Sequence, residues 1–251
     1  MRVYLAGDCF LRDILAKKNS NELSNLYLLR TFAVKEPWFL PYYKKVKDVI
    51  LDSGAFTFMQ GKNVSINWEA YVRQYAEFIK KVGVEHFIEL DIDSIVGYEK
   101  VKQLRSTLEG ITNKQPIPVW HKTRGKEEYI KMCEEYDYVA LGGFAIKNWT
   151  KKDFKYISWF INEAHKRKTK IHGLGFTYFN ELKKYHFDSV DSSAWTSGNR
   201  YGGINYYVGN GIIKTKSKPA GKRIIVEKHI ELAEHNFNEW QKFKEFAEIN
   251  L

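Results

Sequence analysis

The fold is indicated most clearly by residues 86–121, HFIELDIDSIVGYEKVKQLRSTLEGITNKQPIPVWH. Two short apolar runs, His86–Asp91 and Ile117–His121, lie on either side of the amphipathic stretch Tyr98–Ile111. Short apolar runs are typical of buried strands, and a longer stretch with helical periodicity is typical of a helix that covers them. A strand, a helix and a second strand in this order predict a right-handed crossover between parallel strands of one sheet.

The same alternation continues through most of the chain and predicts eight strands. These are Arg2–Ala6, Leu26–Phe32, Asp48–Asp52, His86–Asp91, Ile117–His121, Tyr138–Gly142, Lys170–Gly173 and Phe187–Asp191. The predicted helices are Asn67–Val82, Tyr98–Ile111, Lys126–Tyr136, Lys151–Lys168 and Phe179–Tyr185. Eight repeats favour an α/β fold of the (β/α)8 TIM barrel type. An open doubly wound sheet is the alternative, but no G-x-G-x-x-G motif follows the first strand.

The pattern changes after the eighth predicted strand. Gly209–Asn210–Gly211, between apolar and aromatic residues, predicts a hairpin turn. A basic loop is expected next, with Lys214, Lys216, Lys218, Lys222 and Arg223. A helix is expected from about Ile225 to the end. We therefore predict one barrel domain over residues 1–251, in which 196–251 form a hairpin, a basic loop and a helix packed on the barrel.

The composition limits the classes of function. The formal net charge of +10 predicts a surface that attracts polyanions, although a lysine-rich chain can carry this charge without such a ligand. Two cysteines, Cys9 and Cys133, cannot form a disulfide framework or a four-cysteine metal site. The first residues lack a signal-peptide pattern, and no apolar run is long enough to span a membrane. We expect a cytoplasmic protein with no membrane partner.

Carboxylates follow several of the predicted strands. Asp52, Asp91 and Asp191 end three of them, and the carboxyl ends of barrel strands meet at one mouth. Taken singly, each aspartate is explained as well by a helix cap. Three together, near backbone left bare by glycine, predict a pocket for a flat ligand. Two carboxylates at one mouth suit glycosidic chemistry, in which one attacks or stabilises the sugar carbon and the other transfers a proton.

Five segments at these strand ends carry a resemblance to a known family. They are LDSGAF (Leu51–Phe56), ELDID (Glu89–Asp93), VALGGFA (Val139–Ala145), IHGLGF (Ile171–Phe176) and FDSVDSSAW (Phe187–Trp195). In this order they resemble the tRNA-guanine transglycosylase superfamily, and most of all the phage and bacterial branch that inserts 7-deazaguanine bases into DNA. The resemblance implies an enzyme that exchanges guanine for a 7-deazaguanine derivative through a covalent aspartyl-glycosyl intermediate.

The resemblance also implies roles for individual residues. Asp191 matches the nucleophile, with Asp188 as second choice, and Asp52 matches the aspartate that contacts the base and transfers protons. Asp91 matches the carboxylate that recognises the guanine edge. The base-binding surface is expected to comprise Asp91, Ser53, Gly54, His121, Gly142, Gly143, Phe144 and His172. Of these, Gly142, Gly143 and Phe144 match a backbone segment, and His172 takes a position beneath the heterocycle.

Two departures from the family concern the polymer. The tRNA enzymes are longer and carry a zinc site of three cysteines and a histidine, which this chain cannot supply, so we expect no metal and no cofactor. The expected partners are DNA, or alternatively tRNA, and the free 7-deazaguanine base; a homodimer is left open. Phosphate contacts are expected from Arg200, Lys214, Lys216, Lys218, Lys222 and Arg223, and base stacking from Tyr201, Tyr206, Tyr207 and Trp195.

Three rival hypotheses remain at this point. The first is the same enzyme class acting on tRNA. The second is a glycosidase that only hydrolyses and leaves an abasic site. The third is a non-catalytic basic barrel that binds nucleic acid.

Overall fold

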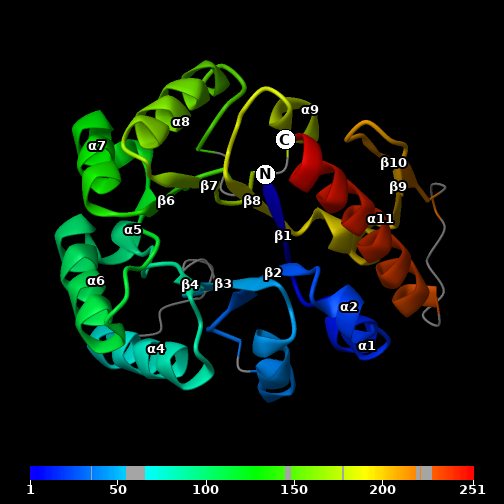
Figure 1. Cartoon of the computed structure of the whole chain (residues 1–251), viewed down its shortest axis with the longest axis horizontal. Helices are drawn as coiled ribbons and strands as arrows, with labels where there is room; N and C mark the ends of the chain where they lie inside the picture. The colour runs from blue at the N-terminus through cyan, green and yellow to red at the C-terminus, as the bar shows by residue number, and fades with distance from the viewer. Residues whose placement is uncertain (35, 55–65, 145–147, 177, 219–220, 222–227) are drawn as a thin grey trace.

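A computed structural model describes residues 1–34, 36–54, 66–144, 148–176, 178–218, 221 and 228–251. Eight parallel strands lie at its centre, and helices lie around them (Figure 1). The strands are β1 (Arg2–Ala6), β2 (Tyr27–Thr31), β3 (Asp48–Asp52), β4 (His86–Phe87), β5 (Val119–Trp120), β6 (Tyr138–Leu141), β7 (Lys170–Gly173) and β8 (Ser189–Ser192). Their spatial order is β4-β3-β2-β1-β8-β7-β6-β5.

The two strands at the ends of this order, β4 and β5, meet at a short seam. Ile88 and Ile117 form an isolated parallel bridge. The Ile117 N–H donates to the Phe87 carbonyl at 2.7 Å, and the Glu89 N–H donates to the Ile117 carbonyl at 3.1 Å. These bonds close the ring of strands, so the predicted (β/α)8 barrel is confirmed.

Both seam strands are shorter than the sequence predicted. Longer strands were expected over His86–Asp91 and Ile117–His121, whereas β4 and β5 have two residues each. Pro118 precedes β5 and has no N–H to donate, so a regular backbone ladder cannot continue there. The Val119 N–H donates instead to the side chain of Glu89, at 2.8 Å from Oε1.

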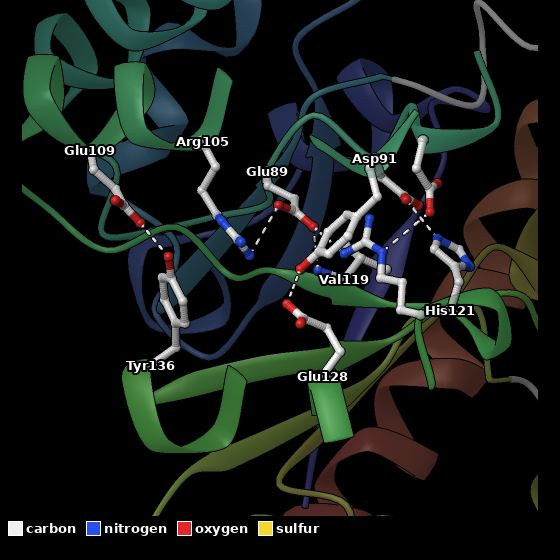
Figure 2. Close-up of polar contacts among 11 residues, drawn as sticks. Glu89, Asp91, Arg105, Glu109, Val119, His121, Glu128 and Tyr136 are labelled. Carbon is white, nitrogen blue, oxygen red and sulfur yellow. Dashed lines mark hydrogen bonds and ion pairs between the residues drawn. The ribbon is translucent and has the colours of Figure 1, made fainter. Parts of the chain in front are cut away.

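Glu89 is fully buried and joins the seam to two arginines (Figure 2). Its Oε1 lies 2.9 Å from Arg124 Nη1, and its Oε2 lies 3.4 Å from Arg105 Nη1. Burial raises the pKa of Glu89, and the charges of the two arginines act in the opposite direction. A buried charge is tolerated when it is paired and hydrogen-bonded, and Glu89 meets both conditions.

The helices of the outer layer follow the expected apolar stripes. In α4 (Trp68–Val82), the side chain of Asn67 accepts from the Ala70 N–H at 2.9 Å and caps the start of the helix. Gly83, with a φ of 74°, ends it. The buried side chains of α4 include Val72 and Ile79, on the face toward the strands.

The other helices occupy the remaining connections. They are α1 (Leu11–Ala16), α2 (Ser20–Leu23), η1 (Pro37–Lys44), α5 (Asp93–Val96), α6 (Tyr98–Thr112), η2 (Lys122–Arg124), α7 (Gly125–Glu135), η3 (Phe154–Tyr156), α8 (Ile157–Lys166), α9 (Phe179–Leu182), η4 (Ala194–Thr196) and α10 (Ser197–Tyr201). The single helix predicted over Lys151–Lys168 is divided into η3 and α8. It ends early because Lys168 adopts a φ of 62°, outside the helical region.

The C-terminal part forms the predicted hairpin, β9 (Gly203–Tyr207) and β10 (Ile213–Ser217), paired antiparallel. The prediction of a basic loop is wrong for Lys214 and Lys216, because they lie on β10 opposite Tyr206 and Ile204. Lys218 follows the strand, whereas Lys222 and Arg223 lie outside the described residues.

The last helix, α11 (His229–Asn250), packs between the hairpin and the barrel (Figure 1). Phe237 lies edge-on to Trp195 at 5.2 Å between ring centroids, and both side chains are fully buried. The expected start near Ile225 falls outside the described residues. Among the helices of the described residues, none has both the length and the apolar character that crossing a membrane requires.

Replacing Glu89 by alanine should destabilise the barrel, because Arg124 and the Val119 N–H would lose their acceptor and buried Arg105 would lose its paired charge. We expect the free energy of unfolding in urea to fall by about 3–5 kcal/mol. The control is Glu109→Ala, which removes a partly exposed carboxylate that accepts from the Tyr136 hydroxyl at 2.8 Å (Figure 2); we expect a loss of about 1 kcal/mol. Equal losses would contradict the role given to Glu89.

Candidate active site

Three aspartates from different strands lie close together at the mouth of the barrel. Asp52 is the last residue of β3, Asp91 follows β4, and Asp191 lies in β8. Burial raises the pKa of Asp52 most, and the negative charges of Asp91 and Asp191 raise it further. Charges act this way over short separations. The structure therefore brings together the three carboxylates that the sequence placed at strand ends.

Asp52 is tuned for proton exchange at neutral pH. Its pKa is raised to about 7, chiefly because burial penalises the ionised form. The backbone amides of Gly54 and Ser53 favour the ionised form and limit the shift. A carboxyl group with a pKa near 7 can act as acid in one step and as base in another.

Ser53 and Gly54 shape the turn after Asp52. Gly54 has a φ of 84°, and a Cβ there would lie 2.3 Å from Ala33 Cβ, so no other residue fits. The Ser53 carbonyl accepts from the Tyr71 hydroxyl at 2.5 Å, which fixes the turn against α4. Ser53 Oγ has no hydrogen-bond partner among the described residues, but Ser53 is fully buried, so it offers no surface to a ligand and its prediction as a base-binding residue is corrected.

Asp191 is held by one of its two carboxylate oxygens. Its Oδ1 accepts from the Gly175 N–H at 2.5 Å and lies 3.2 Å from His172 Nε2. Asp188, the second choice for nucleophile, lies at the opposite end of β8. Its carboxylate accepts from the Ile171 N–H at 2.8 Å and contacts His165 Nε2 at 3.0 Å. Only Asp191 is therefore placed with Asp52.

His172 does not offer a surface to a ligand. It is fully buried on β7, with its ring edge-on to Tyr4 at 6.1 Å. The expectation that it lies beneath a base is corrected, because its exposed area is 0%. Its link to the mouth of the barrel is the contact between His172 Nε2 and Asp191 Oδ1.

Asp91 and His121 form a tight pair that faces across the seam (Figure 2). His121 Nε2 lies 2.6 Å from Asp91 Oδ1. Burial lowers the pKa of His121, but the hydrogen bond to Asp91 and the charges of Asp91 and Asp93 outweigh it, so the pKa is raised overall. The pair uses Asp91 Oδ1, so the second carboxylate oxygen of Asp91 can still accept a hydrogen bond.

Asp91, Asp93 and His121 could also hold a metal ion. One ligand atom from each lies within 4.8 Å of the others. Arg124 already neutralises part of this cluster, since its Nε donates to Asp93 Oδ2 at 3.2 Å. Arg124 could not be recognised from the sequence, because its partners, Glu89 and Asp93, are more than 30 positions away in the chain.

The glycine segment after β6 supports His121. A Cβ on Gly142 would lie 2.6 Å from His121 Cε1. The Gly142 N–H donates to the Trp120 carbonyl and its own carbonyl accepts from Trp149 Nε1, both at 2.9 Å. Gly142 therefore shapes the site and does not bind a base through its amide, which corrects the sequence prediction.

The next two residues differ in how they could serve the site. Gly143 has a φ of 91°, and its carbonyl accepts from the Asn148 N–H at 2.9 Å. Phe144 turns its side chain into the core, stacked on Trp149 at 4.9 Å between ring centroids. A ligand could therefore meet only the backbone of Phe144, the part that the sequence prediction assigned to the base.

Basic residues gather around a groove between the hairpin and α11. Lys214, Lys216 and Lys218 are exposed. The groove measures about 480 Å³, and its polar lining includes Tyr206, Lys216, Lys218, Lys228 and His235. Lys228 and His235 were not predicted, because they lie far along the chain from Tyr206 and no sequence motif connects them with the hairpin. Arg200 lies in α10, and its side chain is outside the described part of the structure.

The aromatic residues expected to stack on bases divide into two groups. Tyr201 is 76% exposed and Tyr206 40% exposed, so both can meet a ligand. Trp195 is fully buried and donates from Nε1 to the Ala6 carbonyl at 2.7 Å, so its prediction as a stacking residue is wrong. Tyr207 is partly buried against Phe246.

A second cleft lies beside His121. It measures about 490 Å³, and Asp93, His121, Lys122, Arg124 and Asn148 contribute to its walls. His121 thus borders both this cleft and Asp91. Residues 55–65, which follow Gly54 in the chain, lie outside the described residues.

Comparisons with known proteins support the fold. No family model matches the chain, and no curated protein matches it. A Coccidioides immitis protein assigned as a fructose-1,6-biphosphate aldolase is 11% identical with a TM-score of 0.57, over 99% of this chain and 89% of that one. The aldolase QR15 is 15% identical with a TM-score of 0.49, over 77% and 89%. The carboxyl transferase domain of Rhizobium etli pyruvate carboxylase is 13% identical with a TM-score of 0.46, over 98% and 47%.

The first of these matches extends along nearly the whole chain and shows a shared barrel architecture. At 11% identity it shows the fold alone, because barrels of this kind host many unrelated reactions.

The raised pKa of Asp52 predicts a pH-dependent stability effect. Because its pKa of about 7 lies above the unfolded value near 4, ionising the folded carboxyl costs stability as the pH rises through this window. Asp52→Asn should therefore raise the free energy of unfolding by roughly 2–4 kcal/mol at pH 8 and by almost nothing at pH 4. Urea titrations of both proteins at the two pH values measure this, and an effect independent of pH would contradict it.

Proposed function

We propose that this protein is a base-exchanging transglycosylase that replaces guanine in DNA with a 7-deazaguanine derivative. The observation that carries the proposal is the convergence of Asp52, Asp91 and Asp191, with the pKa of Asp52 raised to about 7. Each carboxylate has a different environment, and the three environments match three different tasks. tRNA is the alternative polymer.

Asp191 is the nucleophile. Its Oδ1 is occupied by the Gly175 N–H, and no hydrogen bond from the described residues engages Oδ2. In the first half-reaction Oδ2 bonds to the anomeric carbon as the bond from that carbon to the guanine nitrogen breaks. A covalent glycosyl-enzyme results, and the guanine leaves with the bonding electron pair.

Asp52 moves the proton in both halves. With a pKa of about 7, its carboxyl is partly protonated at neutral pH and can give that proton to the departing guanine. The incoming 7-deazaguanine then returns a ring N–H proton to Asp52 as its nitrogen attacks the anomeric carbon. Asp191 leaves as a carboxylate, so protons and charge balance over the cycle.

Asp91 recognises the base. Its Oδ1 is paired with His121, and a carboxylate accepts from the ring N–H and amino group that guanine and 7-deazaguanine share. Recognition of this shared edge lets both bases use the same pocket in turn. Exclusion of water from the pocket is needed, because otherwise the covalent intermediate would hydrolyse.

The target nucleotide must leave the duplex to reach this site, at a cost of a few kcal/mol. The groove lined by Lys216, Lys218 and Lys228 lies on the C-terminal unit that directly follows β8, the strand of Asp191. Its charge suits the phosphates that flank a flipped nucleotide. Exposed Tyr201 and Tyr206 suit stacking on unpaired bases.

The catalytic assignment is tested by incubating the protein with labelled guanine and either DNA or tRNA. We expect label to enter DNA, and Asp191→Asn to lose exchange on the order of 10³-fold or more, with no covalent adduct trapped on a gel. Asp52→Asn should lose on the order of 10²–10⁴-fold. Asp188→Asn is the control at the other end of β8 and should keep near wild-type activity.

Each rival hypothesis gives a different result in this assay. Label in tRNA alone would select the tRNA enzyme. Abasic sites without incorporation would select the hydrolase. DNA binding that survives both aspartate substitutions, with no exchange by the wild type, would select a non-catalytic barrel.

The groove is tested by DNA affinity measured against salt concentration. Lys216→Ala/Lys218→Ala should reduce the slope of log affinity against log salt by about 1 to 2, because each phosphate contact releases about one counterion. Lys80→Ala/Lys81→Ala removes the same charge from exposed positions of α4, on the far side of the barrel from the hairpin (Figure 1), and should leave the slope unchanged. An unchanged slope in the first variant removes the groove from the interface.

A further inference from the structure

The barrel interior contains a polar chain beneath Asp191. Ser189 and Asp191 are two residues apart on β8, so their side chains share the inner face of that strand. His172 lies on the neighbouring strand β7, directly opposite Ser189 in the register. Ser189 and His172 are both fully buried. They lie among the mostly apolar side chains that fill the barrel, such as Ile50 and Val119.

Three contacts link these residues in a line. The Tyr138 hydroxyl contacts Ser189 Oγ. Ser189 Oγ lies 2.5 Å from His172 Nδ1. His172 Nε2 lies 3.2 Å from Asp191 Oδ1. The chain thus runs from β6 through β8 and β7 to the carboxylate that the proposed reaction uses as nucleophile.

Hydrogen-bond chemistry indicates which atom donates and which accepts at each of these contacts. A carboxylate only accepts, so His172 must donate from Nε2 to Asp191. In the arrangement with a proton on Nε2 alone, Nδ1 is the acceptor and Ser189 donates to it. Ser189 is left to accept from Tyr138, and burial raises the pKa of Tyr138, which keeps its hydroxyl protonated. Every donor and acceptor in the chain is satisfied in one arrangement.

We propose that Tyr138, Ser189 and His172 are positioning residues that orient the Asp191 carboxylate for attack. This inference rests on the proposed function. His172 Nε2–H and the Gly175 N–H both bind Oδ1, from β7 and from the turn that follows it. Two donors on one oxygen restrict the rotation of the carboxylate plane, and Oδ2 has no hydrogen bond from the described residues. Ser189 selects the tautomer that places the proton on Nε2.

The proposal predicts a loss in kcat that is not shared by KM. His172→Leu removes the donor to Oδ1 while keeping an apolar side chain of similar size. We expect kcat per active site, counted by trapping the glycosyl-enzyme, to fall about 10- to 100-fold, with KM for the free base within about twofold. His172→Gln restores an N–H donor and should recover most of the loss. His165→Leu is the control, because His165 contacts Asp188 outside the site and should leave kcat unchanged.

A double-variant cycle tests whether Ser189 acts through His172. Ser189→Ala should lower kcat several-fold in the wild-type background and have no further effect in His172→Leu. Tyr138→Phe should behave in the same way with a smaller effect. A residue needed only for folding would lower the number of active sites and not the rate at each, so equal kcat per site in all these variants would overturn the proposal.

Nitrogen NMR of the protein labelled at histidine gives a second readout that does not depend on activity. We expect the His172 ring to carry its proton on Nε2 and to accept at Nδ1, and Ser189→Ala to change this tautomer population. A ring protonated at Nδ1 in the wild type would overturn the proposal. Full activity in Asp191→Asn would instead overturn the proposed function, whereas inactive Asp191→Asn with fully active His172→Leu would reject only the positioning role.

Discussion

The mouth of the barrel depends on the interactions of the buried Glu89 carboxylate. At the seam between β4 and β5 it accepts from the Val119 N–H, where Pro118 interrupts the backbone ladder, and it binds Arg124. Val119 lies two residues before His121, and Arg124 also binds Asp93. One buried side chain therefore reinforces the seam that the backbone bonds of Ile117 close, and links it to the segment that carries His121 and Arg124. The base-recognition part of the proposed site is built directly on the closure of the fold.

The three aspartates show how one barrel mouth gives the same side chain different chemistry. Asp52 is desolvated beside two like charges, which raises its pKa to about 7. Asp91 is paired with a histidine, and Asp191 is held by a backbone N–H and an imidazole. The proposed function assigns proton transfer, recognition of the base and nucleophilic attack to one environment each. In that proposal the division of labour arises from the neighbours of each carboxylate.

The barrel could be predicted from the sequence because strands and helices leave patterns within short stretches of the chain. Apolar runs such as Lys170–Gly173 and stripes such as that of α4 can be recognised within a few residues, and the carboxyl ends of parallel strands then place Asp52 and Asp191 together. Prediction from the sequence failed for residues whose contact partners are distant in the chain. It also failed where a residue's role depends on the direction in which its side chain points. Trp195 was expected to stack on bases but is in the core, and the 35 positions between Glu89 and Arg124 concealed the seam network.

The two glycines beside the site, Gly54 and Gly142, have a consequence for how mutational tolerance should be interpreted. A single methyl group at either would lie within 2.6 Å of a neighbouring side-chain atom, that of Ala33 or of His121. A library of substitutions would therefore record both positions as intolerant, although the Gly142 amide is already used within the sheet. Intolerance at these positions measures the room available to the backbone. Such intolerance alone therefore does not identify either glycine as a ligand contact.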